Sequence, residues 1–246
     1  MQSYSELFEQ RGSSYDQAML AFPEARRQEF AQVLDAAPAR LGMKAGDVPA
    51  GGGYMRGFLP EGVEWFGHEP CASFTNHGDV VADAPSKPLL PLPWPDRYLD
   101  VVYSLAGVHH LEDKTALFRE IYRVTRPEGR FALSDVAEGS KVSRFLDDFV
   151  GRWNSTGHEG VYLGAATLRE LADAGWQVET SGINDFLWRF ANRQDMAAFC
   201  GKLFDIGGIE AEGIIEAIET MLGTEALPDG GIGMRWSLMT VVSSPA

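Results

Sequence analysis

The sequence predicts an α/β domain whose sheet is doubly wound and mostly parallel, and three observations support this prediction. Short apolar runs alternate with helix-length segments from about residue 41 onward, which is typical of parallel strands joined by crossover helices. The glycine-rich stretch GDVPAGGGYM, residues 46–55, follows the first apolar run. The chain closes with MRWSLMTVVSS, residues 234–244, in which β-branched residues accumulate as in a final strand.

The individual elements follow from the same patterns. The first 40 residues are expected to be helical, because their apolar positions recur at steps of three and four residues. Two further helices are expected over residues 114–126 and 165–176, and Pro127 and Gly129 end the first of them. Seven strands are expected, over residues 43–49, 63–69, 78–84, 99–106, 130–136, 176–183 and 234–244.

Two segments, residues 137–164 and 185–230, exceed what such a core needs. Both are predicted to form amphipathic helices. Core packing explains their apolar stripe, but insertions at the carboxyl edge of a doubly wound sheet also build ligand pockets and lids. The aromatic-rich face of the second segment consists of Phe186, Trp188, Phe190, Met196, Phe199, Leu203 and Phe204.

Composition narrows the classes of function. The 246 residues, 45% hydrophobic and 23% charged, suit one globular domain with insertions. A net charge of −14 repels phosphate backbones and so disfavours nucleic acid as a partner. The two cysteines, Cys71 and Cys200, show no metal-ligand spacing and are expected to be free thiols. Without a long apolar run or a signal-peptide core, we expect a cytoplasmic protein that does not act at a membrane.

The glycine-rich stretch is a candidate binding loop. Asp47, Gly51 and Gly53 keep an acid-x-x-x-glycine-x-glycine spacing after the first strand, and small residues there let the backbone approach a ligand. Pro49 fixes φ and removes an N–H donor. Glu69 ends the second strand 22 residues after Asp47, a spacing at which a carboxylate can accept both hydroxyls of a ribose. A plain turn and a solvated loop charge are the alternatives.

In this order, the segments GDVPAGGGYM, GHEPC, VVADA, LPWPDRYLDVVYSLAGVHHL and LFREIYRVTRPEGRFALSDV resemble the class I S-adenosylmethionine-dependent methyltransferases. The chain is similar in particular to the type 11-like branch that methylates small molecules. The resemblance covers about residues 40–180 and is most specific from Leu92 to Asp135. It implies a Rossmann-like, seven-stranded sheet with an antiparallel last strand and helical cap insertions. The single domain, residues 1–246, would comprise N-terminal helices (1–40), a cofactor-binding half (41–136), cap insertions (137–164 and 185–230) and a closing strand (233–246).

The resemblance implies S-adenosylmethionine as the cofactor and S-adenosylhomocysteine as its product. The glycine-rich turn would cup the methionine part, Glu69 would hold the ribose, and Asp83 would receive the adenine amino group. Pro49 replaces the usual first glycine of the family, and the segment after Asp83 is longer than usual. The implied cofactor-binding residues are Asp47, Pro49, Ala50, Gly51, Gly53, Glu69, Pro70, Asp83, Ala84, Ser104, Leu105 and Tyr15. A buried strand terminus is an equal explanation for Ser104 and Leu105.

Methyl transfer from a sulfonium is an in-line displacement with an activated leaving group, so the protein mainly aligns the reactants and excludes water. A base helps when the acceptor is a hydroxyl, and His109 or His110 is predicted in that role; packing is the alternative for the second histidine. Asp135 is predicted to border the acceptor pocket, and His158 and Tyr162 lie in a cap segment. No metal site is expected, because adjacent residues point apart and no second group of ligands accompanies them.

The predicted function is methyl transfer to a small hydrophobic or aromatic acceptor, by a monomer or homodimer. A nicotinamide dehydrogenase would share the glycine-rich turn and the following acid, but it would not explain the forty helical residues before the loop or the closing strand. A regulatory or partner subunit that binds S-adenosylmethionine without catalysis stays open because of Pro49 and the lack of an obvious base. A cofactor-dependent rearrangement stays open as well.

Overall fold

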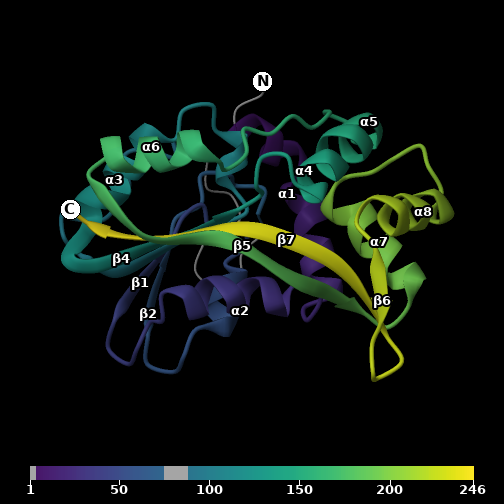
Figure 1. Cartoon of the computed structure of the whole chain (residues 1–246), viewed down its shortest axis with the longest axis horizontal. Coiled ribbons are helices and arrows are strands. Elements are labelled where there is room, and N and C mark those ends of the chain that lie inside the picture. Colours follow the sequence, from purple (N-terminus) through teal and green to yellow (C-terminus); the bar gives the residue numbers. More distant parts are fainter. Residues whose placement is uncertain (1–3, 75–87) are drawn as a thin grey trace.

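The computed structural model describes residues 4–74 and 88–246, with side chains from residue 11 onward. Within these residues one sheet runs through the molecule, with helices on both of its faces (Figure 1). The strand expected over residues 78–84, together with Asp83 and Ala84, lies outside the described part of the chain.

The sheet confirms the predicted architecture. Its strands are ordered β2-β1-β3-β4-β7-β5, and β6 pairs with β7. Strands β1 to β4 pair in parallel, whereas β7 is antiparallel to β4, β5 and β6. Among the described strands, β7 alone therefore runs against the others. Their bounds are β1 (Lys44–Asp47), β2 (Glu64–Gly67), β3 (Leu99–Leu105), β4 (Thr125–Asp135), β5 (Trp176–Phe190), β6 (Thr224–Ala226) and β7 (Ile232–Pro245).

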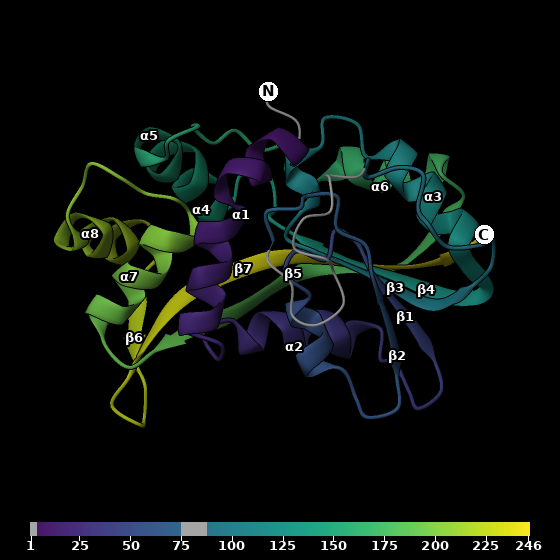
Figure 2. The same cartoon turned by 180° about the vertical axis from the view of Figure 1, so that it is seen from behind.

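Helices cover both faces of the sheet. In both views α3 and α6 lie on one face and α2 on the other, while α7 and α8 lie toward the end that carries β6 (Figures 1 and 2). The helical segments are α1 (Tyr4–Ala21), α2 (Arg27–Ala36), α3 (Thr115–Val124), α4 (Lys141–Arg144), α5 (Gly151–Trp153), α6 (Ala165–Asp173), α7 (Arg193–Leu203) and α8 (Ala211–Met221), the 3₁₀ turns η1 (Tyr54–Phe58) and η2 (Val108–His110), and the π-helical turn η3 (Phe145–Val150).

Side chains along β4 point alternately to the two faces of the sheet and so contribute to two hydrophobic cores, one on each face. Phe131 and Leu133 point to the face covered by α3 and α6, whereas Ala132 packs on the side of α2. Because successive residues of a strand face opposite sides, a strand covered on both faces is apolar at almost every position. This explains why residues 131–133 form a continuous apolar run. The helices contribute Leu117, Phe118, Ile121 and Leu171 to the first core and Phe30, Val33 and Leu34 to the second.

The segment 185–230 begins as a strand, which corrects the expectation that it is helical throughout. Phe186, Trp188 and Phe190 are buried at a spacing of two residues along β5. Their partners in β7 are Trp236, Met234 and Ile232. A period of two is typical of a strand. Pairing with β7, which is distant in sequence, keeps this segment extended up to Phe190. Helix α7 begins only at Arg193, after the side chain of Asn192 accepts a hydrogen bond from the Asp195 N–H.

The short strand β6 was not expected either, because its three residues carry no alternation of their own. It pairs with residues 232–234 of β7. The other insertion, residues 137–164, is helical only from Lys141 to Trp153 and then continues as an irregular segment to residue 164. None of the described helices is both long enough and apolar enough to cross a membrane.

Candidate active site

The glycine-rich stretch forms a tight loop at the carboxyl end of β1. Gly51 and Gly53 have φ values of +53° and +74°, a left-handed conformation that other residues adopt only at a cost. The Ala50 N–H donates to the His68 carbonyl at 3.0 Å, and the Gly53 N–H donates to the Ala50 carbonyl at 2.9 Å. The loop is therefore anchored to the end of β2 on one side and turns directly into η1 on the other.

Pro49 fits this loop because a neighbouring residue makes room for it. A Cβ atom on Gly107, in the loop after β3, would lie 2.6 Å from the Pro49 Cγ atom. Pro49, which replaces a glycine in the loop after β1, is thus accommodated by Gly107 in the loop after β3. The departure from the usual family pattern does not abolish the turn.

Glu69 lies beside the loop, where its spacing from Asp47 predicts it. Its carboxylate accepts hydrogen bonds from the Gly51 N–H and the Cys71 N–H, both at 2.8 Å. The side chain thus ties the glycine loop to the segment that follows β2. Pro70, next to it, is buried. The contact between Glu69 and a ribose stays a prediction.

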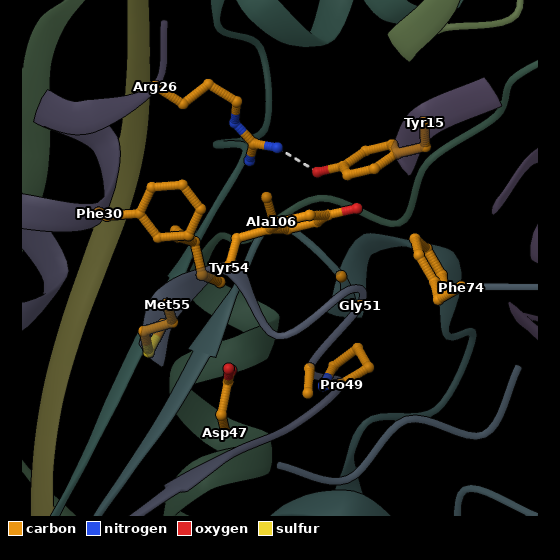
Figure 3. Close-up of a pocket in the computed structure, with 13 residues that line it drawn as sticks. Tyr15, Arg26, Phe30, Asp47, Pro49, Gly51, Tyr54, Met55, Phe74 and Ala106 are labelled. Atoms are coloured by element: carbon orange, nitrogen blue, oxygen red, sulfur yellow. Dashed lines mark hydrogen bonds between the residues drawn. The ribbon is translucent and has the colours of Figure 1, made fainter. Parts of the chain in front are cut away.

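A pocket opens at the carboxyl ends of β1 and β3, and we call it the glycine-loop pocket (Figure 3). In Figure 3 the Arg26 and Tyr15 side chains meet on the side away from Asp47 and Pro49. Six predicted cofactor residues line it: Tyr15, Asp47, Pro49, Ala50, Gly51 and Leu105. Gly53, Glu69, Pro70 and Ser104 are not part of its lining. The lining residues that the sequence did not single out are Arg26, Phe30, Tyr54, Met55, Phe74, Ala106 and Gly107.

Asp47 and Ser104 occupy buried ends of strands. The Trp65 indole N–H donates to the Asp47 carboxyl at 3.3 Å. Burial raises the pKa of Asp47 to about 7, against the Trp65 hydrogen bond and with a further contribution from the nearby Glu69. Ser104 is fully buried, and its hydroxyl has no hydrogen-bond partner among the described residues. The alternative of a buried strand terminus therefore fits Ser104, whereas Leu105 reaches the pocket.

Arg26, which lines the glycine-loop pocket, forms a buried ion pair with Glu29. The Arg26 guanidinium donates to both carboxylate oxygens of Glu29, at 2.7 and 2.8 Å, and also to the Tyr15 hydroxyl. The Trp188 indole N–H donates to the same carboxylate at 2.7 Å. Sequence reasoning missed Arg26 and Glu29, because an acid and a base three residues apart on a helix normally form a surface pair.

A second pocket adjoins the first, and we call it the histidine pocket. The two share Tyr15, Arg26 and Ala106. Its polar end carries three histidines, and the rest of its wall is mainly apolar. Both insertions contribute to it, as the sequence predicted for a ligand pocket. It is lined by Arg11, Tyr15, Arg26, Glu29, Ala106, His109, His110, Val136, Leu146, His158, Trp188, Leu203, Phe204, Trp236 and Leu238.

Asp135 fixes His109 from behind. Its Oδ1 atom lies 2.6 Å from the His109 Nδ1 atom, and the Val136 N–H donates to the same oxygen at 2.7 Å. Its Oδ2 atom accepts the N–H groups of Val108 and His109. Burial opposes ionisation of Asp135, but His109 and these N–H groups outweigh it and keep the pKa of the carboxyl below its usual value. Asp135 does not itself line the histidine pocket and reaches it only through His109.

His109 and His110 do not point apart, which corrects the argument used against a metal site. Their ring centroids are 4.0 Å apart, and the His158 ring lies 5.6 and 5.5 Å from them. Neighbouring side chains alternate in a strand, but these two residues lie on the 3₁₀ turn η2. Burial lowers the pKa of His110 well below its usual value and also lowers that of His158, so both rings are neutral at pH 7.

Comparison with known proteins relates the chain to methyltransferases. Residues 71–133 match the sequence profile of a methyltransferase domain. A methyltransferase of Haloferax volcanii, solved in complex with the Trm112 methyltransferase activator, aligns with 99% of this chain and 98% of its own at a TM-score of 0.59 and 18% identity. The chain therefore shares its fold with solved methyltransferases, and residues 71–133 resemble a methyltransferase domain in sequence.

Other methyltransferases share parts of this similarity. Geranyl diphosphate C-methyltransferase of Streptomyces coelicolor, solved with Mg²⁺, geranyl diphosphate and S-adenosylhomocysteine, aligns with 94% of this chain and 84% of its own at a TM-score of 0.56 and 15% identity. 27-O-Demethylrifamycin SV methyltransferase of Amycolatopsis mediterranei is 48% identical over 44 residues. Those residues are 18% of this chain and only 16% of that relative. In this methyltransferase fold, the glycine-loop pocket lies outside the carboxyl ends of the parallel strands, where open α/β sheets bind their ligands.

Proposed function

We propose that this chain binds S-adenosylmethionine in the glycine-loop pocket and transfers its methyl group to a small acceptor in the histidine pocket. The observation that supports this most directly is that the two pockets share the side chains of Tyr15, Arg26 and Ala106. Methyl donor and acceptor must lie within contact distance for an in-line displacement. Two adjoining pockets of different chemistry meet this requirement.

The residues of the glycine-loop pocket fit the cofactor. Gly51 and Asp47 line the pocket, and the Glu69 carboxylate, just outside this lining, accepts a hydrogen bond from the Gly51 N–H. S-Adenosylmethionine carries a sulfonium, an ammonium and a ribose, all of which carboxylates can bind. When bound, it supplies an activated methyl group. The protein then aligns the acceptor and excludes water, and the half-buried Tyr15 side chain is placed to do so from the shared wall.

The histidine pocket supports an aromatic or apolar acceptor. Trp188 and Trp236 stack with ring centroids 4.3 Å apart, and Phe204 lies against both of them. A flat acceptor would bury its apolar surface against this wall. Its nucleophilic group would then face His109 and His110, the residues that we propose to activate it. The Amycolatopsis relative is named for a substrate that lacks a methyl group on an oxygen, 27-O-demethylrifamycin SV, which supports an oxygen nucleophile here.

Cofactor binding can be tested by calorimetry with S-adenosylmethionine and S-adenosylhomocysteine. We expect Glu69→Gln to weaken binding at least about tenfold, because one interaction of about 1.4 kcal/mol corresponds to that factor. Glu64→Gln is the matched control, because Glu64 is an exposed glutamate at the other end of β2. Equal affinities for both variants and the wild type would place the cofactor elsewhere.

Turnover is then tested with methyl-labelled cofactor and a panel of hydroxylated aromatic compounds. We expect label in at least one product. Tight cofactor binding with no transfer to any acceptor of the panel would favour the non-catalytic binding subunit instead.

A further inference from the structure

Three histidines meet at the polar end of the histidine pocket. One ligand atom from each of His109, His110 and His158 can be chosen so that all three lie within 4.8 Å of one another. His109 and His110 come from η2, and His158 comes from the irregular segment after α5. All three side chains line the same pocket. The fold therefore brings together three imidazoles from two separate parts of the chain.

Carboxylates stand behind two of these rings. Asp135 lies 2.6 Å from the His109 Nδ1 atom, and Asp147 lies 3.3 Å from the His158 Nδ1 atom. The Tyr162 hydroxyl donates to Asp147 and holds it in place. With Nδ1 engaged, the Nε2 atoms of His109 and His158 are left to bind a ligand. A carboxylate behind a ligating imidazole is the usual arrangement around protein-bound metals, because it fixes the tautomer and the orientation of the ring.

The backbone holds the two parts of the cluster together. The Val161 N–H donates to the His109 carbonyl at 2.8 Å, so the segment that carries His158 is bonded directly to the turn that carries His109. A Cβ atom on Gly151 would lie 2.9 Å from the His158 carbonyl oxygen. Glycine at this position thus allows the segment to pack closely on α5. The convergence of the rings is built into the main chain.

We propose that His109, His110 and His158 bind a divalent transition-metal ion, zinc in the first place, whose remaining coordination position opens into the histidine pocket. Three imidazoles with one open position are a typical zinc site for catalysis. Zinc–nitrogen bonds of about 2.0–2.1 Å place tetrahedral ligand atoms about 3.3 Å apart. Binding therefore has to draw the most distant pair together by up to about 1.5 Å, which rotation of the imidazoles supplies.

Acidic side chains near the histidine pocket balance the positive charges of the ion and of Arg11. Asp135 on β4 and Asp147 on η3 supply two negative charges behind the ion. Arg11 of α1 also lines the pocket, and Asp205, which follows α7, acts on it electrostatically. The ion itself would favour an acceptor hydroxyl that binds to it as an anion, such as a phenolate or an alkoxide, because a bound cation stabilises the deprotonated form.

The role of the open position rests on the proposed function. The acceptor's hydroxyl oxygen binds there, and its proton leaves to solvent. The oxygen then forms a bond to the methyl carbon while the carbon–sulfur bond breaks, and the bonding electron pair remains on sulfur. The step involves no oxidation or reduction.

The metal site is tested on the full-length protein, freed of metal by a chelator and titrated with Zn²⁺ and Co²⁺. We expect one ion per chain, and visible absorption bands of four-coordinate Co²⁺. His158→Gln should abolish saturable binding at this site. Asp147→Asn should weaken binding about 10- to 100-fold, the usual effect of losing a group that orients a ligand. Because the Asp147 side chain is 39% exposed, this variant is expected to fold.

Asp148→Asn is the matched control, since Asp148 is the exposed neighbour of Asp147; we expect wild-type metal affinity. The proposal is overturned if the wild type binds neither ion, or if His158→Gln and Asp147→Asn bind as the wild type does. Calorimetry of the metal-free protein with S-adenosylhomocysteine separates the two proposals. Cofactor binding without metal binding refutes only the metal site, and the reverse result refutes only the proposed function.

Discussion

At the scale of single residues, the carboxyl group of Asp47 is buried with little to stabilise its charged form. The residue is 3% exposed, and its carboxyl group faces one indole N–H and the negative charge of Glu69. Ionisation of such a buried group is unfavourable in the folded chain. A cationic ligand in the glycine-loop pocket would offset this cost. We therefore interpret Asp47 as a carboxyl group kept in place for binding.

This interpretation predicts a pH-dependent stability. The folded pKa of Asp47, about 7, lies above the ordinary value of 3.8, so its contribution to stability is full below pH 3.8 and is lost as the pH rises through 7. Between pH 5.5 and 7 the loss is about 2 kcal/mol, at about 1.4 kcal/mol per unit. In Asp47→Asn this loss is absent. Denaturant unfolding of both proteins at pH 5.5 and 8 measures the difference, and parallel curves would contradict the prediction.

At the scale of elements, the conformation of the glycine loop makes Gly53 necessary. We expect Gly53→Ala to destabilise the fold by about 1–2 kcal/mol, because alanine resists the left-handed conformation and its Cβ atom would lie 3.2 Å from the Trp65 ring. Gly57→Ala is the control, because Gly57 lies in η1 with open space around it. Urea unfolding compares the two variants. An equal loss in both would show that the φ angle of Gly53 is not the cause.

Strand β5 is the second element whose role can be tested. Trp188 is 2% exposed, stacks on Trp236 and donates to Glu29. We expect Trp188→Ala to cost about 3–5 kcal/mol, as for other large aromatic residues in a core. Ile183, on the same strand but 54% exposed, should tolerate alanine with a loss below about 1 kcal/mol. Thermal unfolding of both variants gives the comparison, and a small loss for Trp188→Ala would refute the packing argument.

The β5 region also shows where sequence patterns stop being informative. The residues Phe186, Trp188 and Phe190 alternate as in a strand, but they form a short run, and the helical positions Met196 and Phe199 follow after the polar residues 192–195. Three apolar positions are too few to distinguish the period of a strand from that of a helix. Pairing with β7 decides in favour of the strand, and β7 lies more than forty residues further along the chain.

At the scale of the whole molecule, the two pockets join distant parts of one chain. Tyr15 and Arg26 come from the N-terminal helical region, Ala106 follows β3, and Trp188 and Trp236 come from the paired strands β5 and β7. Such walls depend on the complete tertiary structure. Cofactor binding should therefore stabilise contacts well beyond the glycine loop.

Hydrogen exchange can measure this coupling. We expect S-adenosylhomocysteine to slow exchange most strongly in the loop 48–53 and in the segment 105–110, since binding closes the local openings of the residues that it contacts. Protection should extend to the C-terminal half of α1, which carries Tyr15. Helix α8 lines neither pocket and serves as the internal control. Protection confined to α8 would contradict the assignment of the pockets.

The resemblance to the methyltransferases implied the antiparallel last strand. The sequence by itself determined the sheet class, the glycine loop followed by Glu69, and the places of His109 and Asp135 after two successive strands. These features follow from local periods, glycine conformations and the rule that carboxyl ends of parallel strands share one edge. The tertiary structure alone decided that Arg26 and Glu29 are buried, that β5 extends to Phe190 and that His158 joins the histidine pair. Each of these depends on contacts between segments far apart in the chain, and no local pattern of side chains encodes such contacts.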